Sequence, residues 1–190
     1  MRTVWPRLTT GLAAGVMAAG LLLSGCGGDS PEPKPLPKES KSSPSASPSA
    51  TPPAMPAAAK QESDRAVEAF ARHYVDVINY TARSGEREPI DTLSADGCES
   101  CALIGKRAAR TYAEGGRIRG EGWSISRINV VPKQSRERVY IEMTIEQAPE
   151  TVVAKSGAKA KRFPGGTHTF NMVASRKKDG WTVARLDLVA

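Results

Sequence analysis

The sequence has few of the residues that build metal and redox centres, and it has no apolar run long enough to cross a membrane. Its 190 residues include three cysteines, two histidines and 5% aromatic residues. Its main apolar run, residues 11–23, is shorter than the roughly 20 apolar residues of a membrane-spanning helix. No glycine-rich phosphate loop or Gly-x-Ser-x-Gly elbow is present. These absences exclude a polytopic membrane protein, and the length allows one domain, two at most.

The N-terminus has the order of a secretory signal peptide. Arg2 and Arg7 precede the apolar run, whose length suits the hydrophobic region of such a peptide. The residues that follow, Leu23-Ser24-Gly25-Cys26, resemble the lipobox of bacterial lipoproteins. The resemblance implies that residues 1–25 are removed and that Cys26 becomes the first mature residue and carries a diacylglycerol. We therefore predict a lipid-anchored, extracytoplasmic protein on the outer face of the cell membrane. The alternative is a secreted protein that lacks the lipid.

Residues 26–59 are predicted to form a disordered linker after the lipidated cysteine. The segment is rich in Pro, Ser, Ala and Lys, and Leu36 and Met55 are its only large apolar residues. Such a composition buries too little apolar surface to offset the entropy of ordering the chain. Its proline-rich part favours extended polyproline II conformations. The linker would hold a domain away from the membrane.

The remaining residues, 60–190, are predicted to form one domain with helices first and strands after them. Apolar residues recur with a period of 3.6 up to Ser84-Gly85, and Pro56 is placed where this first helix could begin. Two shorter helices are expected at about 89–93 and 101–114. Alternating patterns then predict strands, with a bulge in the first of them, at 123–131, 139–146, 151–154, 167–175 and 181–189. This order indicates an α+β fold with N-terminal helices packed on an antiparallel sheet.

The domain resembles a known fold and a family. The element order is similar to the cone-shaped fold of the nuclear transport factor two and SnoaL-like superfamily, in which helices fill a curved antiparallel sheet. The chain more closely resembles an uncharacterised family of actinobacterial secreted lipoproteins with a domain of unknown function. The resemblance spans about residues 62–189. It is carried by AFARHYVDVINYTARSG (69–85), DGCESC (96–101) and YAEGGRIRGEGW (112–123).

Cys98 and Cys101 remain if Cys26 is lipidated, and an even number of cysteines outside the cytoplasm is expected to pair. The resemblance also treats this pair as structural. A thiol–disulfide oxidoreductase is the alternative, because a CxxC motif at a helix N-terminus lowers a thiol pKa. Such motifs normally follow a strand, whereas helices flank this one. A zinc site would need two further ligands, and His73 and His168 lie far apart in the sequence. We predict neither a metal nor a cofactor.

An acid–base site would most plausibly use His73, Asp76 and Tyr80, which share one flank of the first helix. Enzymes of the similar superfamily place such residues inside the cone for proton abstraction. The simpler expectation is that His73 lies at the rim of the core. Asn79 is expected on the outer face, and His168 either inside the sheet or in a loop.

The net charge of +7 is partly concentrated in two basic stretches. One is a predicted loop at 155–162; the other is Arg176-Lys177-Lys178. Anionic lipids or wall polymers are possible partners, and nucleic acid is not expected outside the cell. The leading prediction is a non-catalytic module that binds an apolar ligand or an envelope protein. A small SnoaL-like enzyme and a CxxC redox protein are the alternatives.

Overall fold

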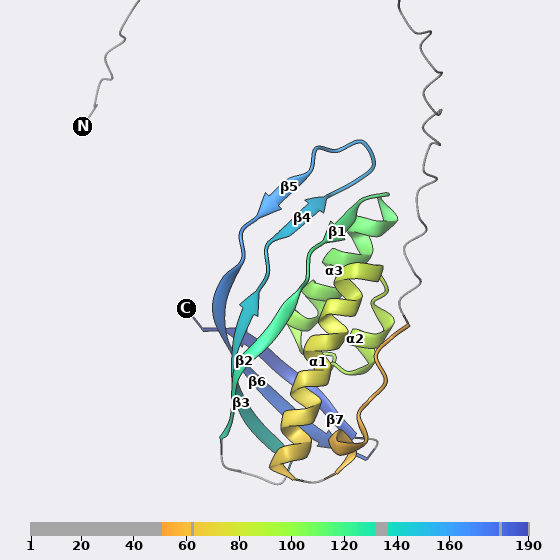
Figure 1. Ribbon diagram of the computed structural model, residues 1–190. Coiled ribbons are helices and arrows are strands. Elements are labelled where there is room, and N and C mark those ends of the chain that lie inside the picture. The colour runs from red at the N-terminus through yellow and green to blue at the C-terminus, as the bar shows by residue number, and fades with distance from the viewer. Residues whose placement is uncertain (1–50, 62, 132–136, 179, 190) are drawn as a thin grey trace, which may run out of the picture. The chain divides into compact units, whose positions relative to one another are not determined.

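A computed structural model describes residues 51–61, 63–131, 137–178 and 180–189. The signal peptide, Cys26 and most of the predicted linker lie outside the described residues. The helical elements precede every strand, as the sequence predicts (Figure 1). The elements are η1 (Ala57–Lys60), α1 (Asp64–Ser84), α2 (Glu88–Thr92), α3 (Glu99–Ala113), β1 (Arg117–Arg119), β2 (Trp123–Val131), β3 (Arg138–Gln147), β4 (Glu150–Val153), β5 (Lys161–Phe163), β6 (Gly166–Lys177) and β7 (Gly180–Leu188).

The first long helix begins later than Pro56. That proline precedes the short 3-10 helix η1, and α1 begins after Ser63, whose hydroxyl accepts a hydrogen bond from the amide of Ala66. A serine in this position satisfies an amide that has no partner within the helix. The chain before Lys60 is nevertheless part of the domain. Ala59, at the end of the predicted linker, is only 2% exposed, and Met55 packs against the core.

The strands form two antiparallel sheets. The larger has the order β2-β3-β6-β7, and the smaller has the order β1-β4-β5. The predicted bulge in β2 is confirmed, because the register with β3 shifts between Ile125 and Arg127. The predicted basic loop at 155–162 is only partly right. Lys161 and Arg162 belong to β5, where they pair with Val152 and Thr151. Alternation over so few residues is too short to predict a strand.

Proline and glycine separate the two sheets. The chain passes from β3 to β4 through Ala148-Pro149 and from β5 to β6 through Pro164-Gly165. A Cβ atom at Gly165 would lie 2.3 Å from the carbonyl oxygen of Gln147 and 3.0 Å from Pro149. These two segments of the chain approach each other so closely that position 165 requires glycine. This break sets the β4–β5 hairpin apart from the larger sheet (Figure 1).

The core lies between α1 and the inner face of the larger sheet. Every second residue of β3 from Val139 to Ile145 is buried, while Tyr140 and Glu142 face outward. The buried side of α1 meets this face with Phe70 and Tyr74, which are fully buried. The two patterns have periods of 2 and 3.6 residues, as expected of a strand and a helix that share one apolar core. The molecule is a mixed α+β domain of cone-like architecture.

Candidate functional site

The three acid–base candidates on α1 do not converge. His73 is 4% exposed and lies in the core, whereas Asp76 is exposed to solvent. The hydroxyl of Tyr80 donates a hydrogen bond to the Glu86 carboxylate at 2.5 Å, and this bond raises the tyrosine pKa. A tyrosine with a raised pKa stays protonated at neutral pH, so it is poorly suited to accept a proton there. None of the three lines either of the two pockets described below.

Burial lowers the pKa of His73 below its ordinary value of 6.5, with Asp76 partly opposing the shift. The unfolded chain therefore binds more protons than the folded chain between the folded pKa and 6.5. Acidification through this window should lower the free energy of unfolding. We expect His73→Gln to flatten this part of the pH profile. Urea unfolding at a series of pH values measures the free energy of unfolding of both proteins. If the two plots of this free energy against pH ran parallel, His73 would not be the group responsible.

Asn79 is a buried polar link between α1 and β2 and does not lie on the outer face. It is 8% exposed. Its Nδ2 donates to the carbonyl oxygen of Trp123 at 2.8 Å, and its Oδ1 accepts from the amide of Trp123 at 2.7 Å. The helical phase alone indicated an exposed position. The side chain turns inward because the start of β2 offers both a donor and an acceptor.

A small pocket lies between the C-terminal half of α1, α3 and the start of β2, and we call it the cone-mouth pocket. Trp123, Ile104 and Ile118 supply part of its apolar lining, and Arg107 forms an ion pair with Glu150 at 3.0 Å. The volume is about 110 Å³, whereas pockets for drug-sized ligands range over roughly 300–1,000 Å³. The cone-mouth pocket therefore has room for a few water molecules or a very small ligand. His168 is in β6 opposite Ile145, on the inner face of the sheet, and does not line this pocket.

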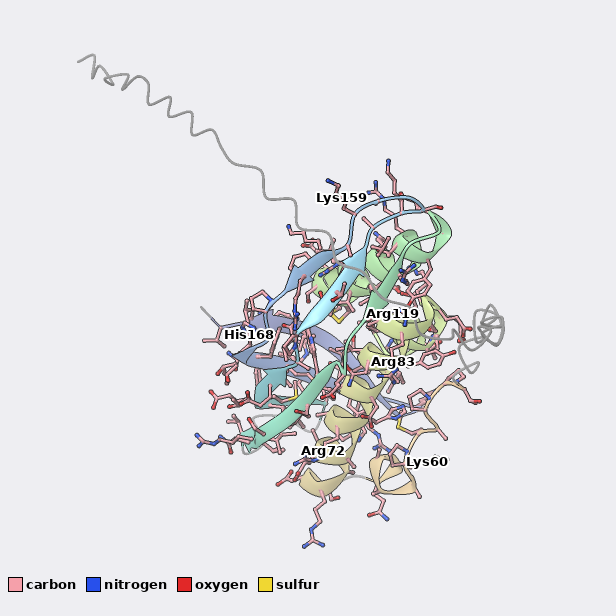
Figure 2. The ribbon with its side chains drawn as sticks, turned by 45° about the horizontal axis from the view of Figure 1, so that its top comes forward. Lys60, Arg72, Arg83, Arg119, Lys159 and His168 are labelled. Atoms are coloured by element: carbon pink, nitrogen blue, oxygen red, sulfur yellow. A yellow bond between two sulfur atoms is a disulfide. The ribbon has the colours of Figure 1, made fainter. Side chains whose placement is uncertain are left out.

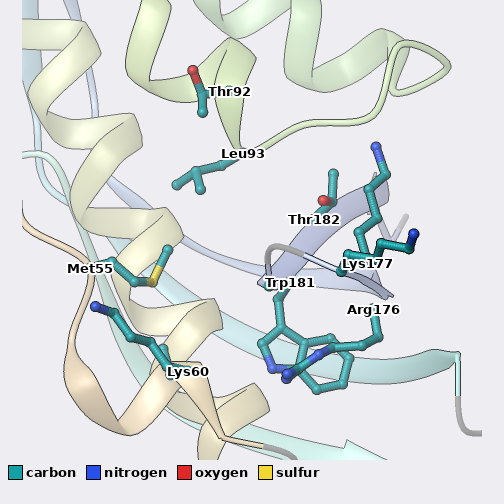
Figure 3. Close-up of a pocket in the computed structure, with 11 residues that line it drawn as sticks. Met55, Lys60, Thr92, Leu93, Arg176, Lys177, Trp181 and Thr182 are labelled. Atoms are coloured by element: carbon teal, nitrogen blue, oxygen red, sulfur yellow. The ribbon is translucent and has the colours of Figure 1, made fainter.

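A larger pocket lies where η1, the end of α2 and the β6–β7 hairpin meet. Its volume is about 690 Å³. Figure 3 shows Lys60 beside Met55 on one side and Arg176 and Lys177 on the other, with Trp181 nearby. We call it the basic pocket. Its lining residues are Met55, Ala59, Lys60, Thr92, Leu93, Arg176, Lys177, Lys178, Gly180, Trp181 and Thr182.

The basic pocket combines cations with apolar surface. Its lining has four basic side chains and no acidic one among the described residues. The Arg176 guanidinium lies 5.3 Å from the centre of the Trp181 ring and donates to the carbonyl oxygen of Gln61 at 2.9 Å. The Trp181 indole donates to the same oxygen at 3.4 Å. These contacts fix two lining side chains of the pocket in place.

The sequence indicates only part of this pocket. It predicts a basic surface at Arg176-Lys177-Lys178. Lys60 begins the predicted domain, Met55 belongs to the predicted linker, and Trp181 is predicted only as part of a strand. The proline at position 56 and the 3-10 helix after it bring the linker end to the hairpin. The 3.6-residue periodicity of a helix does not predict this contact between the linker end and the β6–β7 hairpin.

Cys98 and Cys101 form a disulfide at the start of α3. Both residues are about 1% exposed. The amide of Ala102 donates to the carbonyl oxygen of Cys98, and the hydroxyl of Ser100 donates to the carbonyl oxygen of Leu186 in β7. Redox-active cysteines are accessible to their partners, so this burial favours a structural role. The bond ties the loop after α2 to α3.

The described residues contain neither a cluster of metal ligands nor a membrane-spanning helix. Within the described ranges, no three His, Cys, Asp or Glu side chains are placed to hold a metal ion. No helix in this part of the chain is long and apolar enough to span a membrane.

The architecture defines a cone-shaped α+β domain, and its fold is similar to solved structures. The intermembrane space region of the chloroplast protein ARC6 is 15% identical with a TM-score of 0.52, covering 68% of this chain and 98% of that one. An uncharacterised Caulobacter vibrioides protein with a cystatin-like fold is 11% identical with a TM-score of 0.45, covering 68% and 92%. A chain whose name begins Rd1NTF2 is 9% identical with a TM-score of 0.41, covering 68% and 100%.

The family is shown by sequence. Residues 41–187 match the model of a family of unknown function, DUF6318. The chain belongs to this family. No curated protein matches it. The expected similarity to a domain of unknown function is therefore confirmed. The similarity to the ARC6 region, at 15% identity, concerns the fold alone.

Proposed function

We propose that this protein is a lipid-anchored, extracytoplasmic lipoprotein of the actinobacterial type and a non-catalytic binding module of the cell envelope. Cys26 would carry the lipid, and the linker would give the domain reach from the outer face of the membrane. The ligand would be an anionic amphiphile, with a phosphate or carboxylate head and a short apolar chain. The observation that carries this proposal is the basic pocket.

The pocket's size and chemistry support this ligand class. Its volume of about 690 Å³ lies within the range of small-molecule sites. Lys60, Lys177 and Lys178 would attract the anionic head, and Met55 and Trp181 would contact the apolar chain. The acid–base candidates on α1 form no comparable site, because Asp76 is exposed and His73 is buried. A binding role is therefore better supported than a SnoaL-like reaction.

Octyl phosphate is a suitable probe of the basic pocket, and titration calorimetry measures its binding. The protein would be the chain from residue 27, which contains the whole compact unit Pro44–Ala190. We expect Lys177→Gln together with Lys178→Gln to weaken binding about tenfold. Two exposed charge contacts contribute about 1.4 kcal/mol together, which corresponds to that factor.

The matched control removes two positive charges elsewhere. Arg127→Gln with Arg185→Gln changes exposed cations of β2 and β7. We expect this control to bind octyl phosphate as the unchanged chain does. Equal weakening by both double variants would mean that net charge alone attracts the probe. Octanol is the uncharged counterpart, and equally tight binding of octanol would also contradict the proposal.

A further inference from the structure

The smaller sheet carries a row of basic side chains on one face. Arg119 in β1 pairs with Thr151 in β4, which pairs in turn with Arg162 in β5. Residues directly opposite each other in antiparallel strands point to the same face. Arg117 lies two residues from Arg119 in the same strand, so it shares that face as well. The register therefore gathers three arginines on one side of the sheet.

Lys155 and Lys159 in the β4–β5 loop extend this positive charge to the hairpin tip. We call these five residues, Arg117, Arg119, Lys155, Lys159 and Arg162, the hairpin face. All five are exposed. Among the described residues, none of the five side chains has a hydrogen-bond or ion-pair partner. Their charges are therefore available to an external anion.

The opposite face of the same sheet is already occupied. Arg107 of α3 forms its ion pair with Glu150 there, and its guanidinium lies 5.8 Å from the centre of the Phe163 ring. The ammonium of Lys161 lies 4.7 Å from the centre of that ring. These contacts are internal to the domain. The two faces of the sheet thus differ: one packs toward α3, and the other carries the three arginines with Thr151 and the buried Val153 between them.

We propose that the hairpin face binds a linear polyanion of the cell envelope, a polyol chain linked by phosphodiesters. Cations spaced along β1, and across β4 on β5, can contact several phosphates of one extended chain. The proposal rests on the extracytoplasmic location proposed above, but it does not depend on the basic pocket. Lys159 lies at the hairpin end of the domain and Lys60 at the opposite end (Figure 2).

A bilayer fits this face less well than a polymer does. The loop residues 154–160 are Ala, Lys, Ser and Gly only, whereas interfacial membrane binding buries large apolar side chains such as Trp, Phe or Leu. A single-stranded nucleic acid also fits less well. Its bases stack on aromatic rings, and Phe163, the one aromatic residue of β1, β4 and β5, faces the other way. The hairpin face therefore fits best a polymer that it recognises through its repeated phosphates.

Binding of fluorescent poly(glycerol phosphate) to the chain from residue 27 tests the proposal, with anisotropy followed over a range of salt concentrations. We expect Arg119→Gln with Arg162→Gln to weaken binding at least about tenfold at low salt. The slope of log affinity against log salt should fall by about 1.4, as for two lost contacts to a single-stranded polyanion. The control Arg127→Gln with Arg185→Gln should leave both quantities unchanged.

Three results would overturn the proposal: equal weakening by the control, tighter binding to an oligothymidylate of the same charge, or tighter binding to phosphatidylglycerol vesicles. Unchanged melting temperatures would show that the variants fold. Octyl phosphate binding by the Arg119/Arg162 variant should remain normal. Loss of polymer binding without loss of octyl phosphate binding therefore separates this site from the basic pocket.

Discussion

Replacing Asn79 with alanine is expected to lower the free energy of unfolding by about 3 kcal/mol. The substitution removes two hydrogen bonds and leaves the amide and carbonyl groups of Trp123 without these partners. Gly122 lies against the Asn79 side chain. A Cβ atom at Gly122 would lie 2.3 Å from the Asn79 Oδ1, and the φ angle of 90° suits glycine.

Urea unfolding of the chain from residue 27 measures the Asn79 effect through the midpoint at constant m-value. Asn129→Ala is the matched control, because Asn129 is an exposed asparagine in β2, the strand that Asn79 binds. We expect this control to change the free energy of unfolding by less than about 0.5 kcal/mol. Equal effects of the two substitutions would show that the link between α1 and β2 does not stabilise the fold.

The second large effect is expected at Cys26. If this residue carries the lipid, Cys26→Ser removes the acceptor thiol, and the protein should no longer fractionate with the membrane. A diacylglyceryl pair gives stable anchoring because each buried methylene contributes about 0.8 kcal/mol. Loss of both acyl chains should therefore move almost all of the protein from the membrane fraction to the soluble fraction. Immunoblotting of membrane and soluble fractions from a bacterial host with a lipoprotein pathway measures it.

The control for Cys26→Ser is Ser43→Ala, a small change in the predicted linker. Ser43→Ala should leave the protein with the membrane and keep the mass of the lipidated form. If the Cys26→Ser protein stayed in the membrane fraction to the same extent, the lipid anchor would be wrong. A mature N-terminus at a residue other than Cys26 would lead to the same conclusion.

The fold was predictable where the pattern is local. The alternation from Val139 to Ile145 and the phase slip in β2 were both visible in the sequence and are both present. The helix start was displaced because proline tolerates the first turn of any helix, including a 3-10 helix. The three-residue strand β5 could not be predicted, since its pairing with β4 depends on a register that only the folded hairpin sets.

The candidate sites were predictable only as residue types. The sequence grouped His73 with Asp76 and Tyr80 because they share a helix flank, but burial separates their environments. Both proposed anion sites include basic runs that the sequence analysis noted. The Lys60 side of the basic pocket and the arginines of β1 come from segments distant in the chain. Tertiary contacts bring these segments together, and the spacing of residues in the sequence does not predict such contacts.

The indole N–H signals in a ¹H–¹⁵N correlation spectrum report directly on whether octyl phosphate binds in the basic pocket. The chain from residue 27 contains only two tryptophans, Trp123 in the cone-mouth pocket and Trp181 in the basic pocket. Titration with octyl phosphate should shift the Trp181 signal saturably and leave the Trp123 signal in place. A shift confined to Trp123, or no shift of either signal, would contradict binding in the basic pocket.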